Sequence, residues 1–256
     1  MMDERITSFK RLLDIMDELR EKCPWDKEQT FESIRNLTIE EVHELADAIL
    51  DKDYIEVKKE LGDLALHLVF YSKIASESNL FTITDVLNGI CEKLIIRHPH
   101  VFGQVNVENQ EEVKSNWEDI KLKEGNKSVL SGVPNSLPSL IKASRIQEKV
   151  RAVGFDWEEK SQVWDKVKEE LSELMKEIEN NDKEKIEEEF GDLFFSIVNA
   201  ARLYNVDPET ALERTNKKFI KRFKYLENEA KRLGKNLRDM TLSEMDAIWE
   251  KAKQYD

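Results

Sequence analysis

Two pairs of acidic residues, placed symmetrically about a turn, constrain this chain more than any other feature. In the second half these acids are Glu170, Glu173, Glu189 and Asp192. Residues three apart share one face of a helix, and the turn-like Asn-Asn-Asp at 180–182 separates the two pairs. The pattern therefore predicts two antiparallel helices. The acids lie eight and eleven residues from Asn181 on both sides, so they should face one another roughly 12 and 16 Å from the turn.

The first half contains the same arrangement about Lys52. Each of its acids lies 129 residues before its counterpart, and the four are Glu41, Glu44, Glu60 and Asp63. A solvated acidic face would explain any single pair in a chain that is 36% charged, but it does not explain four matched positions or their duplication. Four clustered carboxylates repel one another strongly, which indicates a cation among them. A divalent metal is the best candidate.

Composition indicates an all-helical protein with two domains. The 256 residues include only 8 Gly and 5 Pro, and they are rich in good helix formers. The internal repeat favours two tandem domains, each built around a helical hairpin. We predict an N-terminal domain at 1–125, a linker at 126–138 and a C-terminal domain at 139–256, because the linker region carries two of the five prolines.

The hydrophobic pattern and the capping residues predict the helices. In the first half they are expected at 4–21, 30–50, 53–78, 82–97 and 111–123, and in the second half at 139–150, 159–180, 183–204, 208–233 and 241–254.

Charge and cysteine content exclude several classes of function. A net charge of −13 argues against a general binder of nucleic acid or membranes. It does not exclude a small anionic substrate, since a metal and local lysines reverse the field. Two cysteines, Cys23 and Cys91, form neither a zinc motif nor a disulfide framework. Because the N-terminus lacks the apolar core of a signal peptide and no apolar run approaches the length of a membrane span, we expect a soluble, cytoplasmic protein.

A basic pair follows each acidic hairpin and indicates a phosphorylated substrate. Lys93 and Arg97 are four residues apart, as are Lys218 and Arg222. Mg²⁺ prefers oxygen ligands and is usually shared between carboxylates and substrate phosphates, and basic side chains hold the remaining phosphate charge. Mn²⁺ is a possible substitute. Trp249 could stack on a base, although an ordinary packed aromatic residue is an equally good interpretation of its position.

Taken together, these motifs resemble the MazG family of nucleoside triphosphate pyrophosphohydrolases. The resemblance rests on the EExxE…ExxD pattern in both halves, RHPHVFG at 97–103, VGFDW at 153–157 and NKKFIKRFKYLE at 216–227. It implies an all-α fold of two tandem four-helix, MazG-like domains, in which hairpins from two subunits build each cleft, and therefore a homodimer. It also implies Mg²⁺-dependent hydrolysis of ribo- and deoxynucleoside triphosphates, ATP included, to the monophosphate and pyrophosphate.

The resemblance assigns roles to residues that match the family pattern. It implies that Glu170, Glu173, Glu189 and Asp192 bind metal and carry catalysis. It implies phosphate or nucleotide contacts for Lys166, Lys185, Lys218 and Arg222, and base stacking for Trp249.

The two halves differ at the lysines. The first half keeps its acids as metal ligands and keeps Lys93 and Arg97, but Leu37 and Glu56 stand where the second half has Lys166 and Lys185. We therefore predict that the second domain is the main triphosphatase and that the first site is weaker, differently specific or regulatory.

Two alternatives remain open. One is a hydrolase restricted to a single nucleotide such as dUTP or dCTP, or to a phosphoribosyl nucleotide. The other is a non-catalytic helical module that senses nucleotides or binds a partner. Intact acids beside Lys218 and Arg222 argue against the second alternative.

Overall fold

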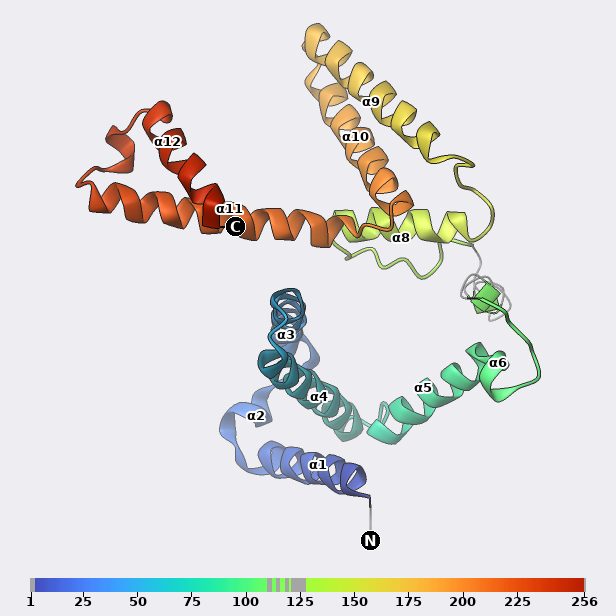
Figure 1. The fold of residues 1–256 in the computed structure, drawn as a ribbon. Coiled ribbons are helices and arrows are strands. Elements are labelled where there is room, and N and C mark those ends of the chain that lie inside the picture. The colour runs from blue at the N-terminus through green and yellow to red at the C-terminus, as the bar shows by residue number, and fades with distance from the viewer. Residues whose placement is uncertain (1–2, 110–111, 114–115, 118–119, 121–127, 256) are drawn as a thin grey trace. The chain divides into compact units, whose positions relative to one another are not determined.

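Every regular element that the structure describes is a helix, which confirms the predicted all-α class (Figure 1). In this computed structural model the described residues are 3–109, 112–113, 116–117, 120 and 128–255. Most of the helix predicted at 111–123 lies outside them, as does the predicted boundary at 125–126. The chain forms two compact units, Met1–Glu108 and Asn109–Asp256. The predicted domain limits therefore stay a prediction.

The first unit is built around a hairpin of two long helices. Its helices are α1 (Glu4–Lys22), α2 (Pro24–Glu28), α3 (Phe31–Asp51), α4 (Tyr54–Glu77), α5 (Ile83–Arg97) and α6 (Pro99–Phe102). Both α1 and α3 pack against α4. The buried side chains between them are Met16, Ile34, Val69, Phe70 and Ile74. Helix α2 lies between the helices predicted at 4–21 and 30–50, where no helix was predicted. It begins at Pro24, because proline suits the first turn of a helix.

The second unit repeats the hairpin and adds a long helix after it. Its helices are α8 (Ser139–Arg151), α9 (Lys160–Asn180), α10 (Lys183–Leu203), α11 (Pro208–Arg232) and α12 (Leu242–Ala252). Helices α9 and α10 lie side by side along their length, and α12 folds back along α11 (Figure 1). The α11–α12 corner is closed by a separate buried cluster of Leu226, Ala230, Met240 and Ile248.

The two hairpins turn at equivalent residues. Lys52 and Asn181 both adopt a left-handed backbone with φ 57°, the conformation that commonly ends a helix. The residue after each of them caps the second helix. The Asp53 carboxylate accepts hydrogen bonds from the backbone N–H groups of Ile55 and Glu56, and the Asp182 carboxylate accepts one from Lys185. The predicted turns are therefore correct to the residue.

Within the described part of the chain, no helix is both long enough and apolar enough to cross a membrane.

Candidate active site

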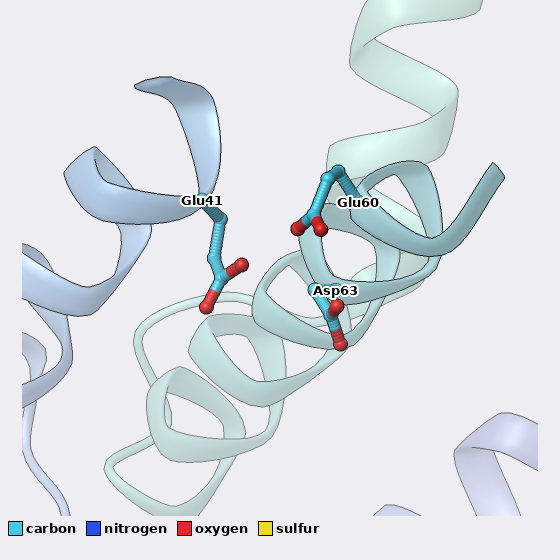
Figure 2. A group of neighbouring side chains, drawn as sticks. All are labelled: Glu41, Glu60 and Asp63. Carbon is cyan, nitrogen blue, oxygen red and sulfur yellow. The ribbon is translucent and has the colours of Figure 1, made fainter. Parts of the chain in front are cut away.

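The first hairpin brings three of its four predicted acids together. Glu41 projects from α3 towards Glu60 and Asp63 of α4 (Figure 2). One carboxylate oxygen of each lies within 4.8 Å of the others. The two α4 acids are one turn apart, so both face the same side of the hairpin. The sequence symmetry thus predicted the facing arrangement.

The second hairpin forms an equivalent group with a different composition. Glu170 and Glu173 of α9 and Glu189 of α10 place one carboxylate oxygen each within 4.8 Å of one another. The first group therefore has one acid from α3 and two from α4. The second group has two acids from α9 and one from α10.

The fourth acid of each set lies at the edge of its group. Glu44 and Asp192 are exposed, and neither belongs to the group within 4.8 Å. Both still act on it through charge, since Glu44 helps to raise the pKa of Glu41 and Asp192 helps to raise that of Glu189. The structure thus brings three of the four predicted metal ligands into direct proximity in each half, and Glu44 and Asp192 remain charged neighbours outside the groups.

Each group contains a buried carboxylate oxygen that lacks a hydrogen-bond partner. These atoms are Oε2 of Glu60, whose side chain is only 2% exposed, and Oε2 of Glu189. A buried, unsatisfied charged group is costly and calls for an explanation. Clustered, hard oxygen donors of this kind are the ligands that Mg²⁺ and Mn²⁺ bind. The donor set therefore fits a divalent metal.

A lysine neutralises one acid of each group, and in the two hairpins it comes from opposite helices. Lys166 Nζ lies 2.6 Å from Glu170, which is one turn further along α9. In the first hairpin Lys59 Nζ lies 2.8 Å from Glu60 on α4. Lys59 did not stand out in the sequence, because neighbouring helical residues point about 100° apart. Its signal was Glu56, three residues earlier, which it also contacts at 3.2 Å.

The acid whose pKa is raised also lies on opposite arms of the two hairpins. In the first group burial raises the pKa of Glu41, assisted by the neighbouring carboxylate of Glu60. Lys59 holds the pKa of Glu60 below its usual range. In the second group burial raises the pKa of Glu189, assisted by the charges of Glu173, Asp192 and Glu170. In each hairpin the acid with the raised pKa lies on the helix opposite the one that carries the lysine.

Lys185, a predicted phosphate contact, faces an acid of its own hairpin. Its Nζ lies 4.0 Å from Glu177 of α9. Glu177 is buried, accepts a hydrogen bond from Asn180 and adds to the charge that raises the pKa of Glu189. The sequence did not single it out, because the position 129 residues earlier is the buried Ala48.

The remaining predicted contacts lie on other helices. On α11, Lys218 is exposed, and the Arg222 guanidinium stands 5.7 Å from the ring centroid of Trp249 on α12. Phe219 packs on that tryptophan with ring centroids 4.9 Å apart. Trp249 is thus a half-buried packed residue with a cation on its ring. Lys93 and Arg97 lie on α5 of the first unit.

Comparison with known proteins identifies the family. The model of the MazG nucleotide pyrophosphohydrolase domain matches twice, over residues 29–102 and 159–226, and each match contains one acidic hairpin. The chain belongs to the MazG family. The resemblance predicted from the motifs is thereby confirmed.

Relatives of this MazG-family chain match it over nearly its whole length. A Thermotoga maritima protein named nucleoside triphosphate pyrophosphohydrolase/pyrophosphatase MazG is 45% identical, over 100% of this chain and 99% of its own. An Escherichia coli nucleoside triphosphate pyrophosphohydrolase is 42% identical, over 98% and 99%. Bacillus subtilis YabN, an uncharacterized protein, is 45% identical over 96% of this chain and 52% of its own. The matches with the Thermotoga maritima and Escherichia coli proteins therefore span both halves of this chain.

Proposed function

We propose that this chain is a Mg²⁺-dependent nucleoside triphosphate pyrophosphohydrolase that converts ribo- and deoxynucleoside triphosphates to monophosphates and pyrophosphate. The observation that carries the proposal is the buried carboxylate oxygen without a partner in each three-acid group, at Glu60 and at Glu189. The names of the full-length relatives support the same reaction.

The acids Glu170, Glu173 and Glu189 would hold the metal in the second unit. A bound divalent ion supplies charge neutralisation at phosphate oxygens and lowers the pKa of a bound water. Asp192, at the edge of the group, is suited to accept the proton of the attacking water. The oxygen of water bonds to the α phosphorus while the bond from that phosphorus to the oxygen bridging the α and β phosphates breaks, and pyrophosphate leaves.

Basic side chains bind the remaining phosphate charge and orient the substrate. Lys166 already lies among the acids of the second group, and charge-assisted hydrogen bonds from lysine or arginine to phosphate are strong. We assign the same task to Lys185, Lys218 and Arg222, and base stacking to Trp249. In the first unit Lys93 and Arg97 would do the equivalent work. We place the main activity in the second unit, because it combines Lys166 with Lys185.

A homodimer is part of the proposal. Apolar side chains remain exposed at helical spacing along both arms of the second hairpin, and a stripe of this kind is typical of an interface. They are Leu171, Met175 and Ile178 on α9, and Phe190, Phe194 and Ile197 on α10. Light scattering should give twice the 30.0 kDa mass of one chain. We place the protein in the cytoplasm, which the unpaired thiols of Cys23 and Cys91 support.

Pyrophosphate release from a panel of nucleotides tests the activity. The purified chain is assayed against the common ribo- and deoxynucleoside triphosphates, with Mg²⁺, with Mn²⁺ and with a chelator. The proposal requires release from several substrates only when metal is present. Release from a single nucleotide would identify a restricted hydrolase, and nucleotide binding without release would identify a sensing module.

A further inference from the structure

Lys59 is the cation within the first acidic group. Its Nζ lies 2.8 Å from Oε1 of Glu60 and 3.2 Å from Oε2 of Glu56. Its side chain is 60% exposed, whereas that of Glu60 is 2% exposed. The other oxygen of Glu60 is buried without a partner beside Glu41 and Asp63. Lys59 thus binds the accessible side of a carboxylate whose inner side faces the group.

Packing explains why this cation stands on α4 and not on α3. Position 37 is equivalent to Lys166 of the second hairpin, but Leu37 packs against the buried cluster around Met16 and Ile34. A lysine there would have to leave that apolar contact. Position 59 is in turn equivalent to Glu188, so the charge at this place is reversed between the two halves.

We propose that Lys59 is the phosphate-binding lysine of the first site, supplied by α4 in the place of the α9 lysine of the second site. This inference rests on the proposed function. While the site lacks a metal, the Lys59 ammonium is paired with the Glu60 carboxylate. Once a divalent ion takes that carboxylate, the flexible and exposed lysine turns to the phosphates of a bound nucleotide. Lys59 is therefore a competitor of the metal and a ligand of the substrate.

Two binding measurements with opposite expected signs test this role. Both use the full chain carrying Glu170→Gln and Glu173→Gln, so that binding reports the first site. Removing a positive charge beside a cation site strengthens metal binding, so Lys59→Met should raise the affinity for Mn²⁺ alone by about threefold. Removing a charge-assisted contact to phosphate should weaken binding of α,β-methylene-ATP at saturating Mn²⁺ by about tenfold.

Neighbouring and conservative variants serve as matched controls. Lys59→Arg keeps the charge and should retain both affinities to within about twofold. Lys58→Met removes an exposed lysine next to it on the same helix and should change neither affinity. Lys59→Gln replaces Lys59→Met if the methionine variant does not give a wild-type circular dichroism spectrum.

Only the opposed pair of changes supports the proposal. If Lys59→Met weakens binding of both Mn²⁺ and the nucleotide, the role of Lys59 is structural. If the nucleotide affinity does not change, Lys59 only forms a surface ion pair. Absence of Mn²⁺ binding by the first site would also overturn the proposal. Failure of the proposed function is a separate result, since it would appear as no pyrophosphate release by the unmodified chain while Lys59→Met still changes Mn²⁺ binding.

Discussion

The Lys166 ammonium lies 2.6 Å from the carboxylate of Glu170, one helical turn further along α9. It also contacts Glu169 at 3.0 Å. These contacts keep a positive charge beside the buried acid of the second group and hold the pKa of Lys166 above its usual range. Lys166 is therefore the cation of the second group, at the place where we propose that the phosphates of the substrate bind.

Lys166→Met should lower pyrophosphate release by about tenfold to a hundredfold. One charge-assisted hydrogen bond contributes about 1.5–3 kcal/mol, and each 1.36 kcal/mol is tenfold in rate. The measurement is kcat/KM for a good substrate in saturating Mg²⁺. Lys168→Met, on the same helix and paired with Asp165, is the control and should keep full activity. Equal losses in the two variants would remove the special role of Lys166.

The two acidic groups should contribute unequally to hydrolysis. Glu170→Gln combined with Glu173→Gln should reduce release by at least about a hundredfold, because a metal supplies several kcal/mol of transition-state stabilisation. Glu41→Gln combined with Glu44→Gln should leave most of the activity. Both double variants are assayed in the full chain on the same nucleotides. Comparable losses would contradict the ranking of the sites and would mean that Lys59, with cations from outside the first hairpin, fully replaces Lys166 and Lys185.

The basic residues of α11 should recognise the phosphate chain more than the nucleoside. Lys218→Ala should weaken binding of α,β-methylene-ATP by about tenfold or more and should affect AMP far less. Because Lys218 is exposed, the midpoint of thermal unfolding should not change. Arg222→Ala should weaken the nucleotide similarly, but it also removes the contact with the Trp249 ring, so the midpoint should fall. Calorimetric titrations that show equal losses for both nucleotides would move these residues away from the phosphates.

The metal-free protein should gain stability when one acid of the second group is neutralised. Burial and like charges raise the pKa of Glu189, so the folded state binds its proton more tightly than the unfolded state does. The ionised carboxylate is therefore destabilising above that raised pKa, and stability returns as the pH falls through it. Glu189→Gln should raise the unfolding midpoint at pH 7 in a chelator. The difference from wild type should shrink towards pH 4.3, about the ordinary pKa of glutamic acid.

The opposite pH dependence is expected at the α11–α12 corner. Lys235, together with the backbone N–H of Thr241, lowers the pKa of Glu244 to about 2. A carboxylate with a lowered pKa stabilises the fold at pH values above the ordinary pKa of glutamic acid. This stabilisation is lost as the pH falls towards the lowered pKa. Between about pH 5 and pH 3 the midpoint temperature of unfolding should therefore fall further for the wild type than for Glu244→Gln. Parallel curves for the two proteins would show that the Lys235 contact contributes nothing in solution.

Local features made the hairpins predictable from the sequence. The left-handed residues Lys52 and Asn181, the caps that follow them and the i, i+3 acids are all set by short-range geometry. The helix bounds agree with those predicted to within one or two residues for the long helices.

The details of the acidic groups depend on packing and were not predictable. Glu60 becomes buried because other helices cover α4, and Leu37 is drawn into the core beside it. The flexible side chain of Lys59 then reaches the carboxylate of the next residue, although the helix directs the two apart. The charge of Glu177 on α9 acts on Glu189 of α10 only because the two arms of the hairpin meet. Periodicity gives the face on which an acid lies, but not the partner it finds there.

The tight turns at Lys52 and Asn181 limit how this protein can change over evolutionary time. One residue inserted between a turn and the acids of its arm would rotate those acids by about 100° about the helix axis and shift them by about 1.5 Å, so they would leave the shared face. Substitutions in this stretch preserve the register, whereas insertions and deletions destroy it. The eight-residue spacing between each turn residue and its nearest acids is therefore as necessary to the shared face as the acids themselves.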